Sequence, residues 1–367
     1  MSEHEPPGGA LPPPAPAECA ALGRLEDLPA DYVASLRERH LVPLWPSLRA
    51  LLPPDLPARR TRVVHWAYTQ IRPLLLRAGE LTPIAKAERR VLVLANPGHG
   101  PDSMQASSAI YLGMQLLLPG EWAPSHRHTP NAVRMVVEGE GAWTNVSGQK
   151  LPMSRGDLIL TPTGLWHEHG HDGDAPVVWL DVLDLPLVHY LETSYHVDGG
   201  RQPVEPGAAE RRYARGGLVP SPGFGRRHEP YPMLRYPWSE ARAALLALAD
   251  ETAVGDAVQL EYVNPETGAA AQNLLGFHAL MLRPGQTLTL PVRSPAAVFH
   301  VIEGGVDARI GASGAEQTLS LAEADTCCVP GYTPATLANR SRREAAFVFV
   351  ADEAPLHRKL GVHEVRT

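Results

Sequence analysis

Short apolar runs separated by turn residues dominate the chain from Arg90 onward. Between Arg90 and about Tyr195 they include VLVLANPG, IYLGMQLLLPG, RMVVEGEGAWT, GDLILTPTG and PVVWLDVLDLPL, and similar runs return from about Leu275 to Val350. Apolar runs of this length, bounded by Gly and Pro, are typical of strands in sandwiches and barrels. The pattern therefore predicts a mainly β protein with two β-rich segments.

Helical spacing of apolar residues occurs in two other places. One is LEDLPADYVASLRERHLVPLW together with PARRTRVVHWAYTQIRPLLLRAGEL, and the other is SEARAALLALADE, for which Ser239 is a plausible N-cap. The first 22 residues are rich in Pro and Gly. We expect them to be disordered, because such a composition cannot bury enough surface to offset the entropy of ordering.

These changes of pattern divide the chain, whose 367 residues are enough for two or three domains. We expect a disordered tail at 1–22, a helical arm at 23–89, a first β-rich domain at 90–197, a linker and helix at 198–250, and a second β-rich domain at 251–367. The linker is assigned because residues 198–238 are rich in Gly, Pro and Arg.

An internal repeat connects the two β-rich domains. LLLPGEWAPSHRH at 116–128 aligns with LMLRPGQTLTLPVR at 280–293, and VVEG at 136–139 aligns with VIEG at 301–304. GDLILTPTGLWHEHGH at 156–171 then aligns with ADTCCVPGYTPATLAN at 324–339. Self-similarity of this kind predicts that one fold occurs twice.

Three histidines of the first domain are candidate metal ligands. His126 and His128 lie two residues apart on a predicted strand, so both face the same side. His167 follows a Pro-Thr-Gly turn at the end of another β run. Three imidazoles would fill half of an octahedral coordination sphere and leave three positions open to substrate and oxygen.

An HxH pair alone is more often a surface or structural feature than a metal site, and the repeat provides a control. The positions that correspond to the three histidines in the second domain are Pro291, Arg293 and Ala335, none of which is an ordinary metal ligand. The turn glycines, Asp325 and Pro330 are kept there. The fold therefore does not need the histidines, which indicates chemistry in the first domain and a scaffold or lid in the second.

The motifs around these histidines resemble those of a known fold family. Gly120, five residues and His126-Arg127-His128 match the first cupin motif, and the run from Gly156 to His167 matches the second. Residues 90–195 thus resemble a metal-binding cupin barrel and residues 275–352 a degenerate one. The resemblance implies a bicupin, with two double-stranded β-helix (jelly-roll) barrels and an N-terminal helical arm.

A narrower resemblance follows from a missing residue. Cupins usually carry a glutamate four or five residues after the second histidine, where this chain has Ala132 and Val133. Bicupins with three histidines and no glutamate, together with HRHTPNAVR, TPTGLWHEHGH and WLDVLDLPL, resemble the gentisate 1,2-dioxygenase family. That family includes salicylate and 1-hydroxy-2-naphthoate dioxygenases, and the likeness covers residues 65–365.

The resemblance implies an Fe(II)-dependent extradiol-type dioxygenase. It would cleave gentisate with dioxygen between the carboxyl-bearing carbon and its hydroxyl-bearing neighbour, giving maleylpyruvate. Three neutral imidazoles leave the +2 charge of the ion uncompensated, which suits a dianionic ortho-hydroxybenzoate. Salicylate or 1-hydroxy-2-naphthoate as main substrate is the alternative, and less favoured readings are a non-catalytic metal- or acid-binding cupin and a Mn or Zn isomerase or decarboxylase. The family tends to form homotetramers.

Candidate substrate-binding residues lie close to the histidines. Arg134 is six residues after His128, so on a continuous strand it shares the ligand face and could bind a carboxylate; an ion pair with Glu138 or Asp181 is the alternative. The family's substrate-binding residues resemble Gln115, Arg134, His169 and Asp181 in this chain, with Arg90 reaching in from the start of the domain.

The remaining candidates refine this pocket. His169 could act as acid or base near neutral pH, and with Asp181 it forms our predicted catalytic set. His171 stands where the cupin motif usually has Asn and leaves the third ligand less certain than the other two, although the turn spacing favours His167. Tyr111 and Gly113, on the strand of Gln115, are candidates for setting the tolerance to ring substituents.

Composition narrows the partners and the location. A net charge of −7 and a pI near 6.1 provide no basic face for nucleic acid. No stretch approaches eighteen uninterrupted apolar residues, so no membrane span is expected. The three cysteines give no disulfide framework, and the N-terminus has no basic start followed by an apolar run. We therefore expect a cytoplasmic protein.

Overall fold

The computed structural model describes residues 23–204, 212–213, 218–221 and 230–366. The predicted tail at 1–22 and the parts of the predicted linker at 205–211, 214–217 and 222–229 lie outside these residues. The chain divides into two compact units, with the boundary in the sequence between Arg59 and Arg60. No helix in the described part of the chain is long and apolar enough to cross a membrane.

The first unit contains a 3-10 helix and two short α-helices. They are η2 (Leu25–Asp27), α1 (Ala30–Glu38) and α2 (Leu48–Leu51), and none of their residues is buried. Large apolar side chains such as Val42, Leu51 and Leu52 are mostly exposed. This part of the predicted helical arm therefore has no core of its own.

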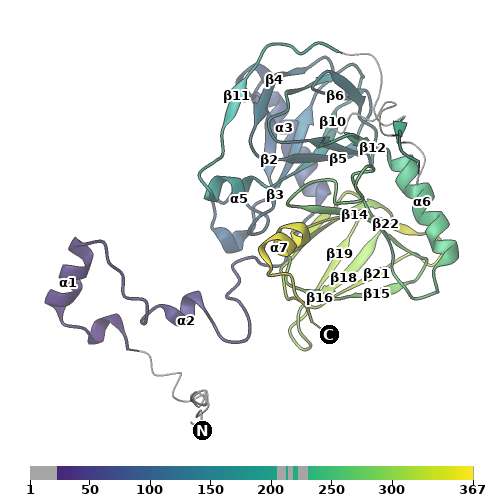
Figure 1. Cartoon of the computed structure of the whole chain (residues 1–367). Helices are drawn as coiled ribbons and strands as arrows, with labels where there is room; N and C mark the ends of the chain where they lie inside the picture. Colours follow the sequence, from purple (N-terminus) through teal and green to yellow (C-terminus); the bar gives the residue numbers. More distant parts are fainter. Residues whose placement is uncertain (1–22, 205–211, 214–217, 222–229, 367) are drawn as a thin grey trace, which may run out of the picture. The chain divides into compact units, whose positions relative to one another are not determined.

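The second unit contains two β-barrels, the first drawn in blue and teal and the second in green and yellow in Figure 1. The mainly β bicupin prediction is confirmed. The first barrel has a six-stranded sheet of order β12-β8-β5-β10-β3-β2 and a five-stranded sheet of order β11-β4-β9-β6-β7. Its elements are β2 (Arg90–Val93), η3 (Pro97–His99), β3 (Tyr111–Leu117), β4 (Trp122–His128), β5 (Ala132–Glu138), β6 (Ala142–Val146), β7 (Gln149–Pro152), β8 (Leu158–Thr161), β9 (His167–His171), β10 (Val177–Leu183), α5 (Leu185–Tyr190), β11 (His196–Asp198) and β12 (Arg235–Tyr236).

The second barrel repeats this arrangement. Its sheets have the orders β1-β20-β17-β22-β14-β13 and β15-β21-β18-β19, and β16 pairs with β23. Its strands and C-terminal helix are β1 (Val64–Trp66), β13 (Val258–Glu261), β14 (Gly276–Leu282), β15 (Thr287–Leu290), β16 (Val292–Arg293), β17 (Ala297–Glu303), β18 (Val306–Ile310), β19 (Gln317–Leu321), β20 (Thr326–Val329), β21 (Ala335–Asn339), β22 (Ala346–Asp352), α7 (Ala354–Leu360) and β23 (Val365–Arg366).

The two barrels exchange one strand each. β1 precedes the first barrel in sequence but pairs with β20 of the second, and the following helix α3 (Tyr68–Leu81) packs on β2 and β3 of the first. β12 pairs with β8 of the first barrel, and the following helix α6 (Trp238–Glu251) packs on β13 and β14 of the second. The remaining helix, α4 (Ile84–Ala87), leads into β2. Each barrel therefore needs a strand that the chain delivers on its way into or out of the other.

Matched acidic residues hold the exchanged segments. The backbone N–H of Tyr68 donates to Asp325 at 2.8 Å, and that of Trp238 donates to Asp157 at 2.9 Å. The hydroxyl of Tyr68 donates to Glu138, and the indole N–H of Trp238 donates to Glu303, each at 2.7 Å.

The same contacts explain where α6 begins. The helix starts at Trp238, one residue before the expected cap Ser239, and no side chain of its own caps it. Asp157 from the other barrel accepts a hydrogen bond from one of the free N–H groups of the first turn. The prediction of Ser239 as N-cap is therefore wrong, because the tertiary structure supplies the acceptor.

The buried carboxylate of Glu353 also links the two barrels, apart from the exchanged strands. It accepts hydrogen bonds from the hydroxyls of Ser107 and Ser108 and from the N–H of Ala109, all from the first barrel, and from the N–H of Ala296 in the second. Burial alone would raise its pKa, but these donors and His357 more than offset the burial and hold the pKa below its ordinary value.

We predict that Glu353→Gln destabilises the protein by about 1–3 kcal/mol, because the amide nitrogen cannot accept and at least one buried donor, such as the N–H of Ala296, loses its acceptor. A carboxyl whose folded pKa is depressed contributes stability above its unfolded pKa and loses it as the pH falls through the folded value. The difference from wild type should therefore be largest near neutral pH and shrink in acid. Urea unfolding at several pH values measures it. Glu344→Gln, at an exposed site, is the control, and an equal effect of both variants would contradict the assignment.

Candidate metal centre

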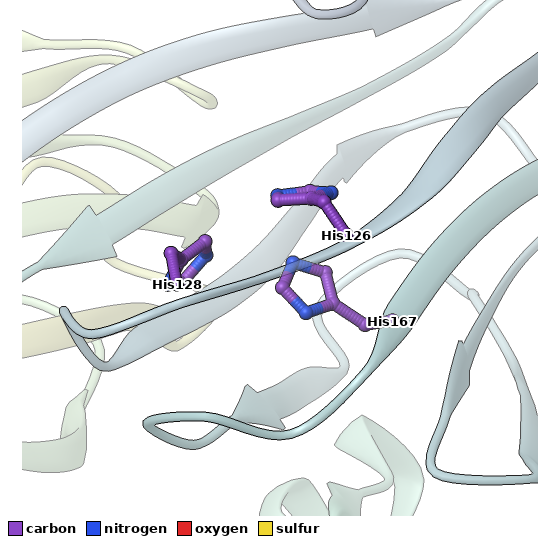
Figure 2. Close-up of side chains that lie close together, drawn as sticks. All are labelled: His126, His128 and His167. Carbon is purple, nitrogen blue, oxygen red and sulfur yellow. The ribbon is translucent and has the colours of Figure 1, made fainter. Parts of the chain in front are cut away.

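Strand pairing brings the three predicted ligands together. β4 and β9 are antiparallel neighbours, with His126 directly opposite His167 and an irregular register between Ala123 and His126. Figure 2 shows the three rings converging on one space. Their centroids are 5.3 Å apart for His126 and His128, 4.2 Å for His126 and His167, and 4.8 Å for His128 and His167.

Among the described residues, the group that could hold a metal ion consists of three histidines. One nitrogen from each ring lies within 4.8 Å of the others, and among the described residues no carboxylate or thiol joins the group. The site thus has the donor set that the sequence predicts, without the usual cupin glutamate. An ion held there would keep open positions for other ligands.

Backbone carbonyls fix the orientation of two of the rings. The Nδ1 of His128 lies 2.7 Å from the carbonyl of Pro130, and the Nδ1 of His167 lies 3.0 Å from the carbonyl of Leu165. Since a carbonyl only accepts, each Nδ1 carries the proton and each Nε2 keeps a lone pair for a metal. The Nε2 of His167 is buried and has no partner among the described residues, which is the situation of a ligand atom.

The environment keeps these rings uncharged. Burial, followed by the nearby Arg89, lowers the pKa of His126 to about 2. Burial and Arg134 lower the pKa of His128 to about 4. The pKa of His167 is also far below its ordinary value, first because of burial and then because of Arg134. Neutral imidazole is the form that binds metals, so the site is ready to bind at neutral pH.

Arg134 lies in the same interior, opposite Asp181 in the β5–β10 pairing. Its Nε is 3.3 Å from the Asp181 carboxylate, and its NH1 contacts the hydroxyl of Thr161. The alternative partner Glu138 instead binds Arg72 outside the pocket. Burial raises the pKa of Asp181 to about 6 despite the opposing effect of Arg134. Arg134 therefore faces the same interior as the three histidines, as predicted, and forms an ion pair there with Asp181.

Two buried polar atoms of this interior, Gln115 Nε2 and His169 Nε2, have no hydrogen-bond partner among the described residues. The Nδ1 of His169 is bound to Thr144 at 2.9 Å, and burial places its pKa far below the ordinary value. A buried polar group without a partner is costly, so these atoms are suited to binding a polar ligand.

The structure corrects the expected role of Arg90. Arg90 is opposite Leu116 in the β2–β3 pairing and faces helix α3, where its guanidinium binds Glu121 and the carbonyl of Gly79. Its neighbour Arg89, one residue earlier, lies on the opposite face. Arg89 donates to the carbonyl of Pro124 at 2.6 Å and contacts the Nδ1 of His126. The residue that reaches the metal centre is therefore Arg89.

Local backbone geometry directs Arg89 inward. Glu88, the residue that ends α4, has a φ of +53° and a ψ of −50°, which L residues rarely adopt. Burial and repulsion from Arg134 lower the pKa of Arg89 to about 10. The carboxylates of Asp181, Glu88 and Asp198 oppose this lowering, and only Arg134 forms an ion pair with Asp181.

The remaining candidates divide between the pocket and the frame. Gly113 lies opposite Asp181, and a side chain there would collide with Val91 and with the hydroxyl of Tyr111, at 2.5 and 2.7 Å from the added carbon. Tyr111 and Gly113 are therefore packed together. His171 lies away from the three ligands and contacts the carbonyl of Ala175 at 2.5 Å.

The outer face of the two ligand strands is braced. The guanidinium of Arg127, which lies between the two histidines of β4, sits 5.0 Å from the ring centre of Trp166, the residue before His167. Trp143 packs closely on Gly170. Both tryptophans thus pack against neighbouring side chains or backbone of the two ligand strands.

Comparisons with known proteins agree with this geometry. A family model described as "Cupin domain" matches residues 113–183. A gentisate 1,2-dioxygenase from Ralstonia sp is 68% identical over 94% of this chain and 96% of its own length. A gentisate 1,2-dioxygenase from Streptomyces sp is 35% identical over 92% of this chain and 94% of its own length.

A solved structure shows the same architecture. The crystal structure of salicylate 1,2-dioxygenase from Pseudoaminobacter salicylatoxidans with gentisate matches with a TM-score of 0.84 at 32% identity, covering 93% of this chain and 94% of the other. High identity and near-complete coverage extend from the exchanged strands through both barrels. The chain belongs to the gentisate 1,2-dioxygenase family of ring-cleaving bicupin dioxygenases.

Proposed function

We propose that this enzyme is an Fe(II)-dependent gentisate 1,2-dioxygenase that uses dioxygen to open the ring between the carboxyl-bearing and the adjacent hydroxyl-bearing carbon, giving maleylpyruvate. The observation that carries the proposal is an open three-histidine centre beside two arginines, the buried Arg134 and the partly buried Arg89. The 68% identity to a gentisate 1,2-dioxygenase supports the choice of substrate.

Iron fits the donor set of His126, His128 and His167. Three neutral imidazoles suit a borderline divalent ion, and the unpartnered Nε2 of His167 is available to it. Zinc would bind a similar set but has no redox chemistry. A bound Fe(II) would supply the redox chemistry that couples an electron-rich ring to dioxygen.

The arginines would bind and orient the substrate. Arg134 is held by Asp181 and Thr161, so its position is fixed before a ligand arrives. A guanidinium binds a carboxylate through two parallel hydrogen bonds and thereby sets the plane of the ring. Arg89 adds a second positive charge, which favours the dianionic form of an ortho-hydroxybenzoate.

His169 and Asp181 are the proposed catalytic pair. Thr144 fixes the Nδ1 of His169, and burial keeps the ring neutral, so its free Nε2 can accept or donate a proton at the substrate. Asp181 would act mainly by holding Arg134. The unpartnered amide of Gln115 would donate to a substrate oxygen, while Tyr111 and Gly113 would limit the size of ring substituents.

Salicylate is the second candidate substrate, since the matched crystal structure is of a salicylate 1,2-dioxygenase. 1-Hydroxy-2-naphthoate is a further alternative. Gentisate carries a second hydroxyl para to the first, which makes its ring easier to oxidise. We therefore favour gentisate for this pocket.

We also propose a cytoplasmic homotetramer with no nucleic-acid or membrane partner. The exposed apolar residues of the N-terminal arm, such as Leu51 and Leu52, are suited to a contact with another copy of the chain.

The substrate is tested by oxygen uptake after anaerobic purification and Fe(II) loading. We expect uptake with gentisate to exceed that with salicylate and 1-hydroxy-2-naphthoate, with maleylpyruvate as the product. His167→Ala should lose both iron and uptake, because two imidazoles cannot complete the centre. No oxygen consumption with any of the three acids would end the dioxygenase proposal.

Substrate binding is tested with Arg134→Ala. Loss of a buried charge contact costs about 2–5 kcal/mol, so the KM for gentisate should rise about thirtyfold or more. Iron content, measured by metal analysis, should stay near the wild-type value. Arg134→Lys keeps the positive charge but lacks the planar guanidinium, so its KM for gentisate should lie between the values of the wild type and of Arg134→Ala. Loss of iron in Arg134→Ala would show that the residue maintains the fold instead.

The two neighbouring arginines provide a matched pair. Arg89→Gln should raise the KM for gentisate about tenfold or more, since it removes a charge from the pocket. Arg90→Gln should leave the KM nearly unchanged and lower the melting temperature, because its buried contacts with Glu121 and Gly79 are lost. A raised KM in Arg90→Gln together with an unchanged KM in Arg89→Gln would instead place Arg90 in the pocket.

A further inference from the structure

The second barrel has a cavity where the first has its metal centre. Its volume is about 280 Å³, and its wall includes Pro291, Arg293 and Ala335, which occupy the positions of the three histidines in the repeat. Phe299 and Val350 pair across β17 and β22 as Arg134 and Asp181 pair across β5 and β10, and both line the cavity. The barrel has therefore lost the ligands but kept the space.

The wall of this cavity is open to small molecules. Phe299, Ala335 and Val350 keep 4%, 4% and 3% of their surface exposed, whereas Ala308 and Leu337 of the same barrel core are at 0%. These side chains, which correspond to Arg134, His167 and Asp181 of the first barrel, thus face a space that a solvent molecule can enter. An apolar interior of this kind favours a ring or an alkyl group over water.

One cation marks the cavity. The Arg293 side chain is 26% exposed, and its NH2 lies 3.1 Å from the buried carboxylate of Asp352. Among the described residues this is the only polar contact of the guanidinium, so other N–H groups remain for a ligand. The other polar side chains in the wall are Gln259 and Thr333, and none of the wall residues is His, Cys, Asp or Glu.

We propose that the second barrel binds a single-ring aromatic monocarboxylate without converting it, with the ring beside Phe299 and the carboxylate on Arg293. Because no residue of the wall is a usual metal ligand, the cavity cannot hold the iron that chelation and ring cleavage require. Drug-sized ligands occupy cavities of about 300–1,000 Å³, so this smaller space selects one ring rather than two. The site goes beyond the proposed function, because it needs neither iron nor turnover.

Benzoate is a suitable probe, since without an ortho-hydroxyl it is a poor chelator for the first barrel. Equilibrium dialysis of labelled benzoate against the iron-loaded, full-length Arg134→Ala variant isolates the second site. We expect about one benzoate per chain to remain bound. Loss of all benzoate binding in Arg134→Ala would overturn the proposal, whatever the result of the oxygen-uptake test on wild type.

Three further variants in the Arg134→Ala background locate the ligand. Arg293→Gln should weaken benzoate binding about tenfold or more by removing the charged donor. Ala335→Leu should abolish binding by filling the cavity. Arg309→Gln, which changes an exposed arginine on β18 of the same barrel, should have no effect. Unchanged binding in Arg293→Gln and Ala335→Leu would contradict the site.

The variants are checked for folding in an otherwise wild-type chain. Arg293→Gln and Ala335→Leu lie outside the first barrel and should keep gentisate oxygen uptake. If Ala335→Leu fails to fold, the result with Arg293→Gln decides alone, because that change introduces no bulk.

Discussion

In the interior of the first barrel, the guanidiniums of Arg89 and Arg134 lie beside three uncharged histidines. Asp181 forms an ion pair with Arg134, and the histidines cannot take a proton without leaving the metal-binding state. A divalent ion held by the histidines would add positive charge to this interior. An anionic ligand suits an interior with two guanidiniums and no glutamate among the histidines, which agrees with the ortho-hydroxybenzoate that we propose as substrate.

The frame that maintains this interior is shared by both barrels. β1 completes a sheet of the second barrel, although the helix that follows it packs on the first, and β12 does the reverse. The first N–H of each following helix donates a hydrogen bond to an aspartate, Asp325 for α3 and Asp157 for α6. Neither barrel has a complete sheet without a segment from the other side. The second barrel is therefore required for the structure of the first, even though it has lost the metal ligands.

Loss of the ligands changed the second barrel less than the sequence suggests. The substitution of an ion pair by Phe299 and Val350 makes the interior apolar but leaves it hollow. A packed core would have required larger side chains at Ala297 and Ala335. The remaining space and Arg293 provide the basis for a second ligand site.

The sequence by itself determined the repeat, the bicupin fold and which three histidines come together, because these depend on local spacing. Residues two apart on a strand share a face, and the Pro-Gly turns fix where strands begin. The position of Arg134 on the face of the histidines followed from its even spacing from His128, and Asp181 was one of two ion-pair partners that the sequence allowed. Only the tertiary structure decided between Arg89 and Arg90, because the strand begins between them and the turn at Glu88 sets which one points inward. The exchange of β1 and β12 and the start of α6 at Trp238 also depend on contacts between residues far apart in the chain, which no local pattern encodes.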